Sequence, residues 1–168
     1  MNLWFEREFD FSFPADLFPN VCARLRGTPA RLEEVLAGQP SNILTVKPQQ
    51  KWSAQEHGGH LLDLEPLWLA RVEDYVQGSQ QLTPTDLRNR KTDTANYNAQ
   101  APGQILAAFR AERKKLLERV SQIDPALHSS SIPHPRLHTP MRLVDHLFFV
   151  AEHDDHHLAH IWELVRPA

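Results

Sequence analysis

The sequence predicts an all-α protein, a four-helix bundle built as one domain over residues 1–168 with an N-terminal arm over residues 1–14. Four long blocks repeat apolar residues at the spacing of a helix. Strand signals are weak and confined to Phe9–Phe13. No stretch has the composition of a linker between two cores, and 168 residues suffice for one sizeable core.

The first helix is expected from Ala15 to Ala37, directly after Pro14. Gly27-Thr28-Pro29 lies inside this block, where a proline removes a backbone donor and predicts a kink or a break. Gly38 and the proline that follows it are typical of a helix end. The apolar stripe of the block consists of Val21, Leu25, Leu32, Val35 and Leu36.

The second helix is expected from a cap at Ser53 to about Val76, and Gly78 stops it. Ser53 followed three residues later by Glu56 is a capping box, in which each side chain satisfies a backbone N–H of the first turn. Pro66 lies inside the block and is expected to bend the helix.

A polar connection of more than twenty residues follows, from Ser79 to Ala101. Connections of this length are uncommon in compact domains and often carry function. We expect this one to cover a pocket, with Asn96 or Asn98 near its rim. A disordered surface loop is the alternative interpretation.

The third helix is expected from Gly103 to Ile123, and its basic residues are interpreted as a solvated face. A connection rich in Pro, Ser and His spans Ser129–Pro140. The fourth helix is expected to start at Thr139-Pro140, a cap followed by proline, and to end near Val165. The basic residues of the third block are Arg110, Arg113, Lys114 and Lys115.

The fourth helix carries apolar residues on two faces, whereas a bundle helix normally has one apolar stripe and one polar face. This pattern predicts a homodimer in which Phe148 or Trp162 contributes to the interface. The alternative is that the arm, with Trp4, Phe5, Phe9 and Phe11, covers the second face within one chain. The second face comprises Leu147, Phe148, Leu158, Trp162 and Val165.

Composition excludes several classes of protein. The 18 Lys+Arg residues against 21 Asp+Glu leave no basic excess for a nucleic-acid groove. No apolar run is long enough to span a membrane, and the acidic N-terminus does not resemble a secretory signal. The single cysteine, Cys22, excludes an internal disulfide and fits a cytoplasmic protein. Cys22 is interpreted as a half-buried thiol, with a nucleophile as the alternative.

The stretch H-D-D-H-H-L-A-H in the fourth block concentrates four of the ten histidines. A helix turns by about 100° per residue, so His153 and His157 stack one turn apart, with His160 nearly in line. Two imidazoles at i and i+4 can hold one metal ion. A third ligand is offered by His60, which projects from the apolar side of the second block. Three histidines with open coordination positions are typical of a catalytic site rather than a closed structural one.

Each of these residues also has an ordinary interpretation. A single buried histidine such as His60 can be a hydrogen-bonded core residue, and a histidine-rich helix can be a solvated face. An expression tag is excluded because core-spaced apolar residues interleave with the histidines. The interleaved residues are Leu158, Ile161, Trp162, Leu164 and Val165.

Three segments together resemble the DinB/YfiT-like superfamily of metal-dependent enzymes, a family of bundles unrelated to the DNA polymerase that shares the name. They read R-L-R-G-T-P-A-R-L-E-E-V-L-A-G, K-W-S-A-Q-E-H-G-G-H-L-L-D-L-E-P-L-W-L-A-R and A-E-H-D-D-H-H-L-A-H-I. The resemblance covers about Leu17 to Trp162. It implies an up-down-down-up four-helix bundle, a homodimer, and one divalent ion held by His60, His153 and His157.

The resemblance leaves the reaction open, because members of the family include hydrolases and thiol S-transferases that use bacillithiol. We expect a metal-dependent enzyme with zinc, nickel or iron, acting on a small molecule by hydrolysis or by thiol-dependent S-transfer with a low-molecular-weight thiol. Asp63 and Glu152 are candidates for a ligand-orienting or general-base role, and His156 and His160 for the pocket wall. The alternative is a non-catalytic metal-binding module for stress response or interaction.

Overall fold

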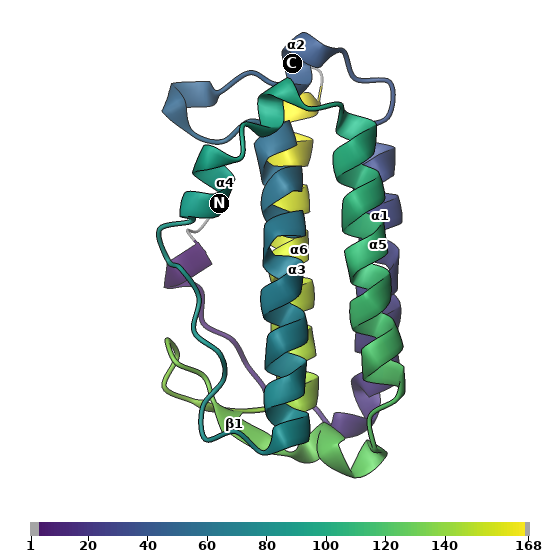
Figure 1. Ribbon diagram of the computed structural model, residues 1–168, viewed down its shortest axis with the longest axis vertical. Helices are drawn as coiled ribbons and strands as arrows, with labels where there is room; N and C mark the ends of the chain where they lie inside the picture. Colours follow the sequence, from purple (N-terminus) through teal and green to yellow (C-terminus); the bar gives the residue numbers. More distant parts are fainter. Residues whose placement is uncertain (1–3, 167–168) are drawn as a thin grey trace.

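The structure, a computed structural model, describes residues 4–166. Its four long helices follow the predicted up-down-down-up course, which confirms the expected fold class (Figure 1). Of the predicted arm and domain, residues 1–3 and 167–168 lie outside the described residues. Among the described residues, no helix is both long and apolar enough to cross a membrane. The long helices are α1 (Phe18–Leu36), α3 (Ala54–Gln77), α5 (Pro102–Ser121) and α6 (Leu143–Val165).

Helices α3 and α5 run in the same direction, so the chain between them, residues 78–101, passes back along the length of the bundle (Figure 1). We call this connection the return segment. This return contains α4 (Arg90–Thr94) and the 3-10 turn η4 (Tyr97–Ala99). The other short elements are η1 (Trp4–Glu6), η2 (Ala15–Leu17), α2 (Ser41–Leu44), η3 (Pro48–Gln50), η5 (Pro125–Ser129), β1 (Ser131–Pro133) and β2 (Pro140–Arg142).

The second predicted helix is confirmed by α3. The Ser53 side chain accepts from the Glu56 backbone N–H at 3.1 Å, and the Glu56 carboxylate accepts from the Ser53 N–H at 2.9 Å. The helix ends at Gly78, whose positive φ of 66° suits a residue without a Cβ. The capping box therefore fixes the start of α3, and with it the position of His60 along the helix.

The sequence predicted a kink or a break at Gly27-Thr28-Pro29, and the break does not occur, because α1 continues through this stretch as one helix. Pro29 has no N–H for the carbonyl of Leu25, four residues earlier. The Arg113 guanidinium on α5 donates to that carbonyl at 3.1 Å instead. A buried side chain from a neighbouring helix thus satisfies the acceptor that Pro29 leaves free.

Arg113 also corrects the interpretation of α5 as carrying only solvated cations. Its side chain is buried and donates to Glu65 on α3 at 2.6 Å and to Asp154 on α6 at 2.6 Å. Thr28 on α1 donates to the same Asp154 carboxylate at 2.8 Å. Burial raises the pKa of Glu65 to about 7, and the adjacent Arg113 charge opposes that rise. One charged cluster therefore ties the four long helices together.

The start of α6 differs from the prediction. Pro140 belongs to β2, which pairs antiparallel with β1, and the helix begins at Leu143. Arg142 is its N-cap, and its backbone N–H donates to Asp145 at 2.8 Å. Pro140, which the sequence predicted as the first residue of the helix, is instead paired with Pro133 in the hairpin.

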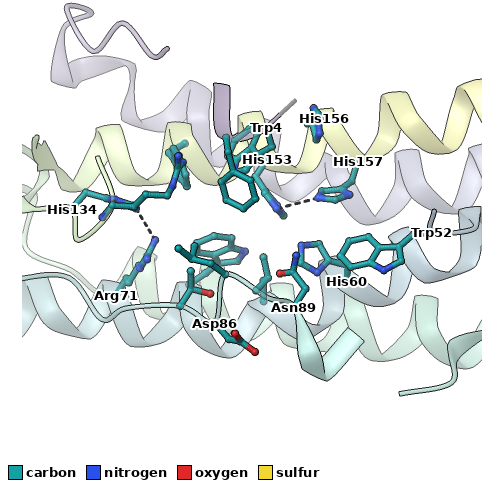
Figure 2. Close-up of a pocket in the computed structure, with 17 residues that line it drawn as sticks. Trp4, Trp52, His60, Arg71, Asp86, Asn89, His134, His153, His156 and His157 are labelled. Carbon is teal, nitrogen blue, oxygen red and sulfur yellow. Dashed lines mark hydrogen bonds between the residues drawn. The ribbon is translucent and has the colours of Figure 1, made fainter. Parts of the chain in front are cut away.

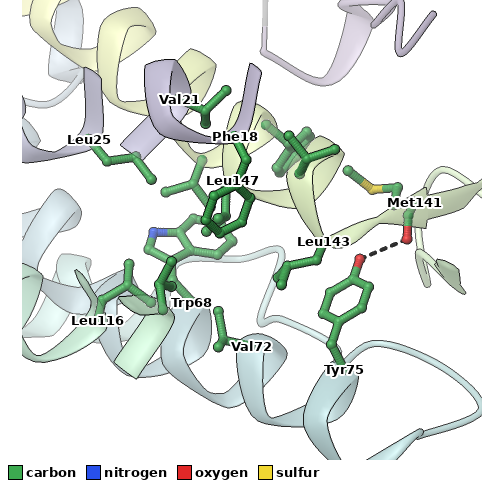
Figure 3. Packing of buried hydrophobic residues seen from close by; sticks show 14 of the residues in the cluster. Phe18, Val21, Leu25, Trp68, Val72, Tyr75, Leu116, Met141, Leu143 and Leu147 are labelled. Carbon is green, nitrogen blue, oxygen red and sulfur yellow. Dashed lines mark hydrogen bonds between the residues drawn. The ribbon is translucent and has the colours of Figure 1, made fainter. Parts of the chain in front are cut away.

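One hydrophobic cluster of the core is built around Trp68 and Leu147 and includes Met141 of the β1–β2 hairpin (Figure 3). Tyr75 lies at its edge and donates its hydroxyl to the carbonyl of Met141 at 2.8 Å, which fixes the hairpin to α3 (Figure 3). A second cluster is built around Leu32 and Phe109 and includes Ala54 at the start of α3 and Val165 at the end of α6.

The weak strand signal at Phe9–Phe13 does not correspond to a strand, and the phenylalanines of this stretch pack against α6 instead. The ring of Phe148 lies 5.0 Å from that of Phe13 and 6.4 Å from that of Phe11. The arm therefore covers part of the second apolar face within the chain. Trp162 remains 54% exposed.

Candidate metal centre

Three histidines from two helices converge where α3 lies against α6. His60 comes from α3, and His153 and His157 come from successive turns of α6. One ring nitrogen of each lies within 4.8 Å of the other two, and all three residues are buried. The Nε2 atoms of His153 and His157 are 3.1 Å apart. The predicted trio therefore comes together, with its nitrogens close enough to share one ion.

The environment of the trio keeps the imidazoles neutral. Burial lowers the pKa of His60 to about 4. Burial, and then the neighbouring imidazoles, lower the pKa of His153 and His157 well below 6.5. Neutral imidazole is the form that ligates metals, so the donor set suits a divalent cation at neutral pH.

The orientation of the His60 ring is set by a residue of the return segment. The Thr92 hydroxyl donates to Asp63 at 2.9 Å, so it accepts from the Nδ1–H of His60 at 3.1 Å. This arrangement leaves the Nε2 lone pair of His60 free to bind a metal. Asp63, one of the two candidates from the sequence, thus acts on His60 through Thr92.

Asp63 is fully engaged in this role. Its other carboxylate oxygen accepts from the Tyr97 hydroxyl at 2.7 Å and lies 3.1 Å from the Lys91 ammonium. All three partners belong to the return segment, so Asp63 also fastens that segment to α3.

A cavity of about 120 Å³ opens over the trio (Figure 2). The return segment forms one wall, which confirms the expected side of the bundle. The residues that line it are Thr85, Asp86, Leu87 and Asn89 rather than Asn96 or Asn98. Asn98 instead accepts from the Ser53 hydroxyl at 2.7 Å. Four aromatic side chains, Trp4, Trp52, Trp68 and Phe149, also line the cavity.

A comparison with known protein families identifies the family of this chain. The model of the DinB superfamily matches residues 24–161, which include all four long helices in whole or in large part. The chain belongs to the DinB superfamily.

Among solved structures, this DinB-superfamily chain is similar to YfiT from Bacillus subtilis, with a TM-score of 0.81 and 18% sequence identity. The match covers 95% of this chain and 91% of YfiT. YfiT is described as a probable metal-dependent hydrolase with an unusual four-helix bundle topology. At this identity the likeness establishes the shared fold. No curated protein matches the chain significantly.

His57 is a residue of the site that the sequence interpretation did not assign. Its Nδ1 lies 2.8 Å from the Nδ1 of His157. If His157 offers Nε2 to a metal, its Nδ1–H donates to His57, so His57 orients His157 as Thr92 orients His60. The signal was present in the sequence, because His57 lies three residues before His60 and so on the same side of the helix.

The other candidate of this DinB-superfamily chain, Glu152, does not line the cavity. Its carboxylate pairs with Arg7 of the arm at 2.5 Å and with Arg24 of α1 at 2.6 Å. Glu152 therefore fastens the arm and α1 to the outer side of α6.

His156 and His160 differ in position. His156 lines the cavity, and its ring lies 5.5 Å from that of Trp4. His160 is half-buried beyond the cavity and stacks on His57 at 5.2 Å. The histidine trio is thus flanked by further imidazoles, and among residues 4–166 none of these is hydrogen-bonded to a carboxylate.

Proposed function

We propose that this protein is a metal-dependent enzyme that hydrolyses a small molecule, with one divalent cation held by His60, His153 and His157. The observation that carries this proposal is the trio of ring nitrogens within 4.8 Å at the base of a cavity. Among residues 4–166 the cluster has three members, which leaves coordination positions for water and substrate. The description of YfiT as a probable metal-dependent hydrolase supports the same class.

The side chains around the trio have defined tasks. Thr92 and His57 hold the rings of His60 and His157 in the tautomers that present a lone pair. Trp4 and Trp52 pack on His153 and His60 at centroid distances of 5.0 and 4.7 Å and keep bulk water from the imidazoles. A divalent ion in such a site lowers the pKa of bound water and supplies a nucleophile at neutral pH.

The geometry favours an enzyme over a non-catalytic module. An ion that only ties two helices together is normally closed by four protein ligands. Here three histidines line the cavity, and a fourth coordination position of an ion that they hold would face that cavity. The reaction class is proposed as hydrolysis, and S-transfer from a low-molecular-weight thiol is tested alongside it.

The first experiment is metal analysis of the untagged protein purified without chelator. We expect about one zinc, nickel or iron per chain, and none in the His153→Ala/His157→Ala double variant. His138→Ala, which removes an exposed histidine, is the matched control. An unchanged metal content in the double variant would refute the site.

Activity is then measured on a panel of small esters and amides, with and without EDTA, and on electrophiles in the presence of bacillithiol. Hydrolysis that EDTA abolishes and metal restores supports the proposal. Turnover that depends on the thiol alone would replace hydrolysis by S-transfer. Loss of helical far-UV dichroism together with the metal would show that the ion is structural.

A further inference from the structure

Arg71 is a buried cation without an acidic partner. It projects from α3 into the wall of the cavity and is 1% exposed. Its Nε donates to the Thr83 carbonyl at 2.8 Å, and Nη1 lies 3.1 Å from Nε2 of His134. Its Nη2 is buried and has no partner among the described residues. Within residues 4–166, no carboxylate forms an ion pair with it.

A second buried arginine, Arg113, shows how this fold compensates a buried guanidinium with carboxylates. Arg113 is also 1% exposed, and it pairs with both Glu65 and Asp154. Removing a guanidinium from water costs several kcal/mol unless opposite charges and hydrogen bonds compensate it. Arg113 meets this condition within the protein, whereas Arg71 does not.

The acidic side chains nearest to Arg71 are engaged elsewhere. The Asp74 carboxylate accepts from the backbone N–H of Thr83 at 2.6 Å and from the Ser79 hydroxyl at 3.3 Å. Asp86 lines the cavity, but its carboxylate accepts from the Arg90 side chain and from the backbone of Arg88 and Arg90. Neither carboxylate forms an ion pair with the guanidinium, and the Asp74 charge offsets only part of the effect of burial on the pKa of Arg71.

A second guanidinium reinforces the positive charge. Arg136, next to the hairpin, lines the same cavity, and its Nη2 is also buried without a partner. Burial lowers the pKa of Arg71 to about 10, and the Arg136 charge contributes to that lowering. Arg71 therefore still carries its charge at neutral pH, in a place where no carboxylate of residues 4–166 pairs with it.

Figure 2 shows that Arg71 and His134 occupy one end of the cavity and His60 and His157 the other. The Trp68 indole lies between them, with its ring 5.5 Å from the Arg71 guanidinium carbon and 5.6 Å from the His153 ring. An apolar body lying along this indole would therefore reach the guanidinium with one end and the histidine trio with the other.

We propose that Arg71, assisted by Arg136, binds the oxyanion of a small-molecule ligand, a carboxylate or a phosphate. The guanidinium offers planar N–H groups that match either anion. The part of this inference that concerns the substrate rests on the proposed function. In that case the substrate is an anionic small molecule, with its scissile group at the histidine trio and its oxyanion at Arg71. The anion site itself requires no metal.

The test is calorimetric titration of the EDTA-treated protein with benzoate, phenyl phosphate and neutral benzamide. We expect benzoate or phenyl phosphate to bind and benzamide not to bind, and the stronger of the two anions identifies the class. Arg71→Met should weaken anion binding about 10- to 100-fold, the scale of losing a charge-assisted hydrogen bond. Arg136→Met should weaken it less, and Arg119→Met, at a surface ion pair with Glu73, should leave it unchanged.

Equal binding of benzamide and benzoate, or unchanged affinity in Arg71→Met, would overturn the proposal. If Arg71→Met does not fold, Arg71→Lys keeps the charge and the aliphatic stem but loses the planar donors, and the same weakening is expected of it. The titration is repeated on the His153→Ala/His157→Ala variant. Anion binding that persists there, in a protein unable to take up metal, separates the anion site from the metal proposal.

Discussion

Gly59 lies so close to the ring of Tyr97 that a Cβ at position 59 would come within 2.2 Å of the Cδ2 atom of that ring. The missing side chain lets the return segment lie directly on α3. From this position the Tyr97 hydroxyl reaches Asp63 at 2.7 Å. Gly59, directly before His60, therefore lets the return segment cover the candidate metal centre.

Gly59→Ala is expected to displace Tyr97 and to destabilise the protein by about 1–3 kcal/mol, the usual cost of overpacking. Gly58→Ala is the matched control, because its Cβ would meet Leu32 at an ordinary 3.8 Å. Alanine also favours the helix by about 1 kcal/mol over glycine, so the control should be neutral or stabilising. Thermal unfolding of both variants checks this, and equal melting temperatures would contradict it.

Thr92→Val tests the orientation of His60. Valine keeps the shape of threonine but removes the hydroxyl that joins the Nδ1–H of His60 to the Asp63 carboxylate. We expect metal affinity to fall about 10- to 100-fold, as is typical when a partner of a ligating histidine is lost. Competition with a chelator of known affinity measures this, and Thr94→Val on the exposed side of α4 is the control. Identical affinities for both variants would show that Thr92 does not orient the ligand.

Arg113→Met should be among the most destabilising single substitutions, by about 3–5 kcal/mol, because it leaves two buried carboxylates without their cation. It also leaves the Leu25 carbonyl, freed by Pro29, without a donor. Urea denaturation gives the change in the free energy of unfolding, and Arg119→Met should change it little. A loss no larger than that of the control would mean that the buried cluster contributes little net stability.

The sequence was sufficient for features that depend on local spacing. The capping box of α3 and the stacking of His153 and His157 follow from positions along one helix. The family resemblance supplied the order of the helices and paired His60 with the α6 histidines. These expectations needed no knowledge of which side chains meet across the bundle.

What the sequence did not indicate depends on contacts between distant segments. Periodicity cannot tell that Arg113 faces the core while its neighbour Lys114 faces solvent, because its partners come from two other helices. The tie between Thr92 and His60 depends on the path of the return segment, which no repeat encodes. The continuity of α1 through Pro29 likewise depends on a donor from α5.

Cys22 gives a prediction about pH. Burial raises the pKa of its thiol to about 11, against the small opposing effect of Arg26. Only the thiolate reacts with alkylating agents, so the rate of modification by iodoacetamide should rise about tenfold for each pH unit between pH 7 and pH 10. Mass spectrometry of timed samples measures the rate, with Cys22→Ala as the blank. A rate that levels off near pH 8.5 would show an accessible, ordinary thiol.

We propose, finally, that the protein forms a homodimer through the end of α6 that carries Trp162. Of the second apolar face of this helix, Phe148 is covered by the arm, and Leu158 and Val165 are 8% and 5% exposed. Trp162 remains as a large apolar side chain at 54% exposure, and indoles are enriched at the centres of protein interfaces.

Light scattering at micromolar concentration should give twice the chain mass for the natural sequence and a single chain mass for Trp162→Glu, because a buried carboxylate without a partner opposes association. Leu17→Glu is the control, because Leu17 is an exposed apolar residue of η2, directly before α1, whereas Trp162 lies near the end of α6. It should leave the dimer intact. A monomeric mass for the natural sequence would refute the dimer, and dissociation by Leu17→Glu instead of Trp162→Glu would place the interface elsewhere.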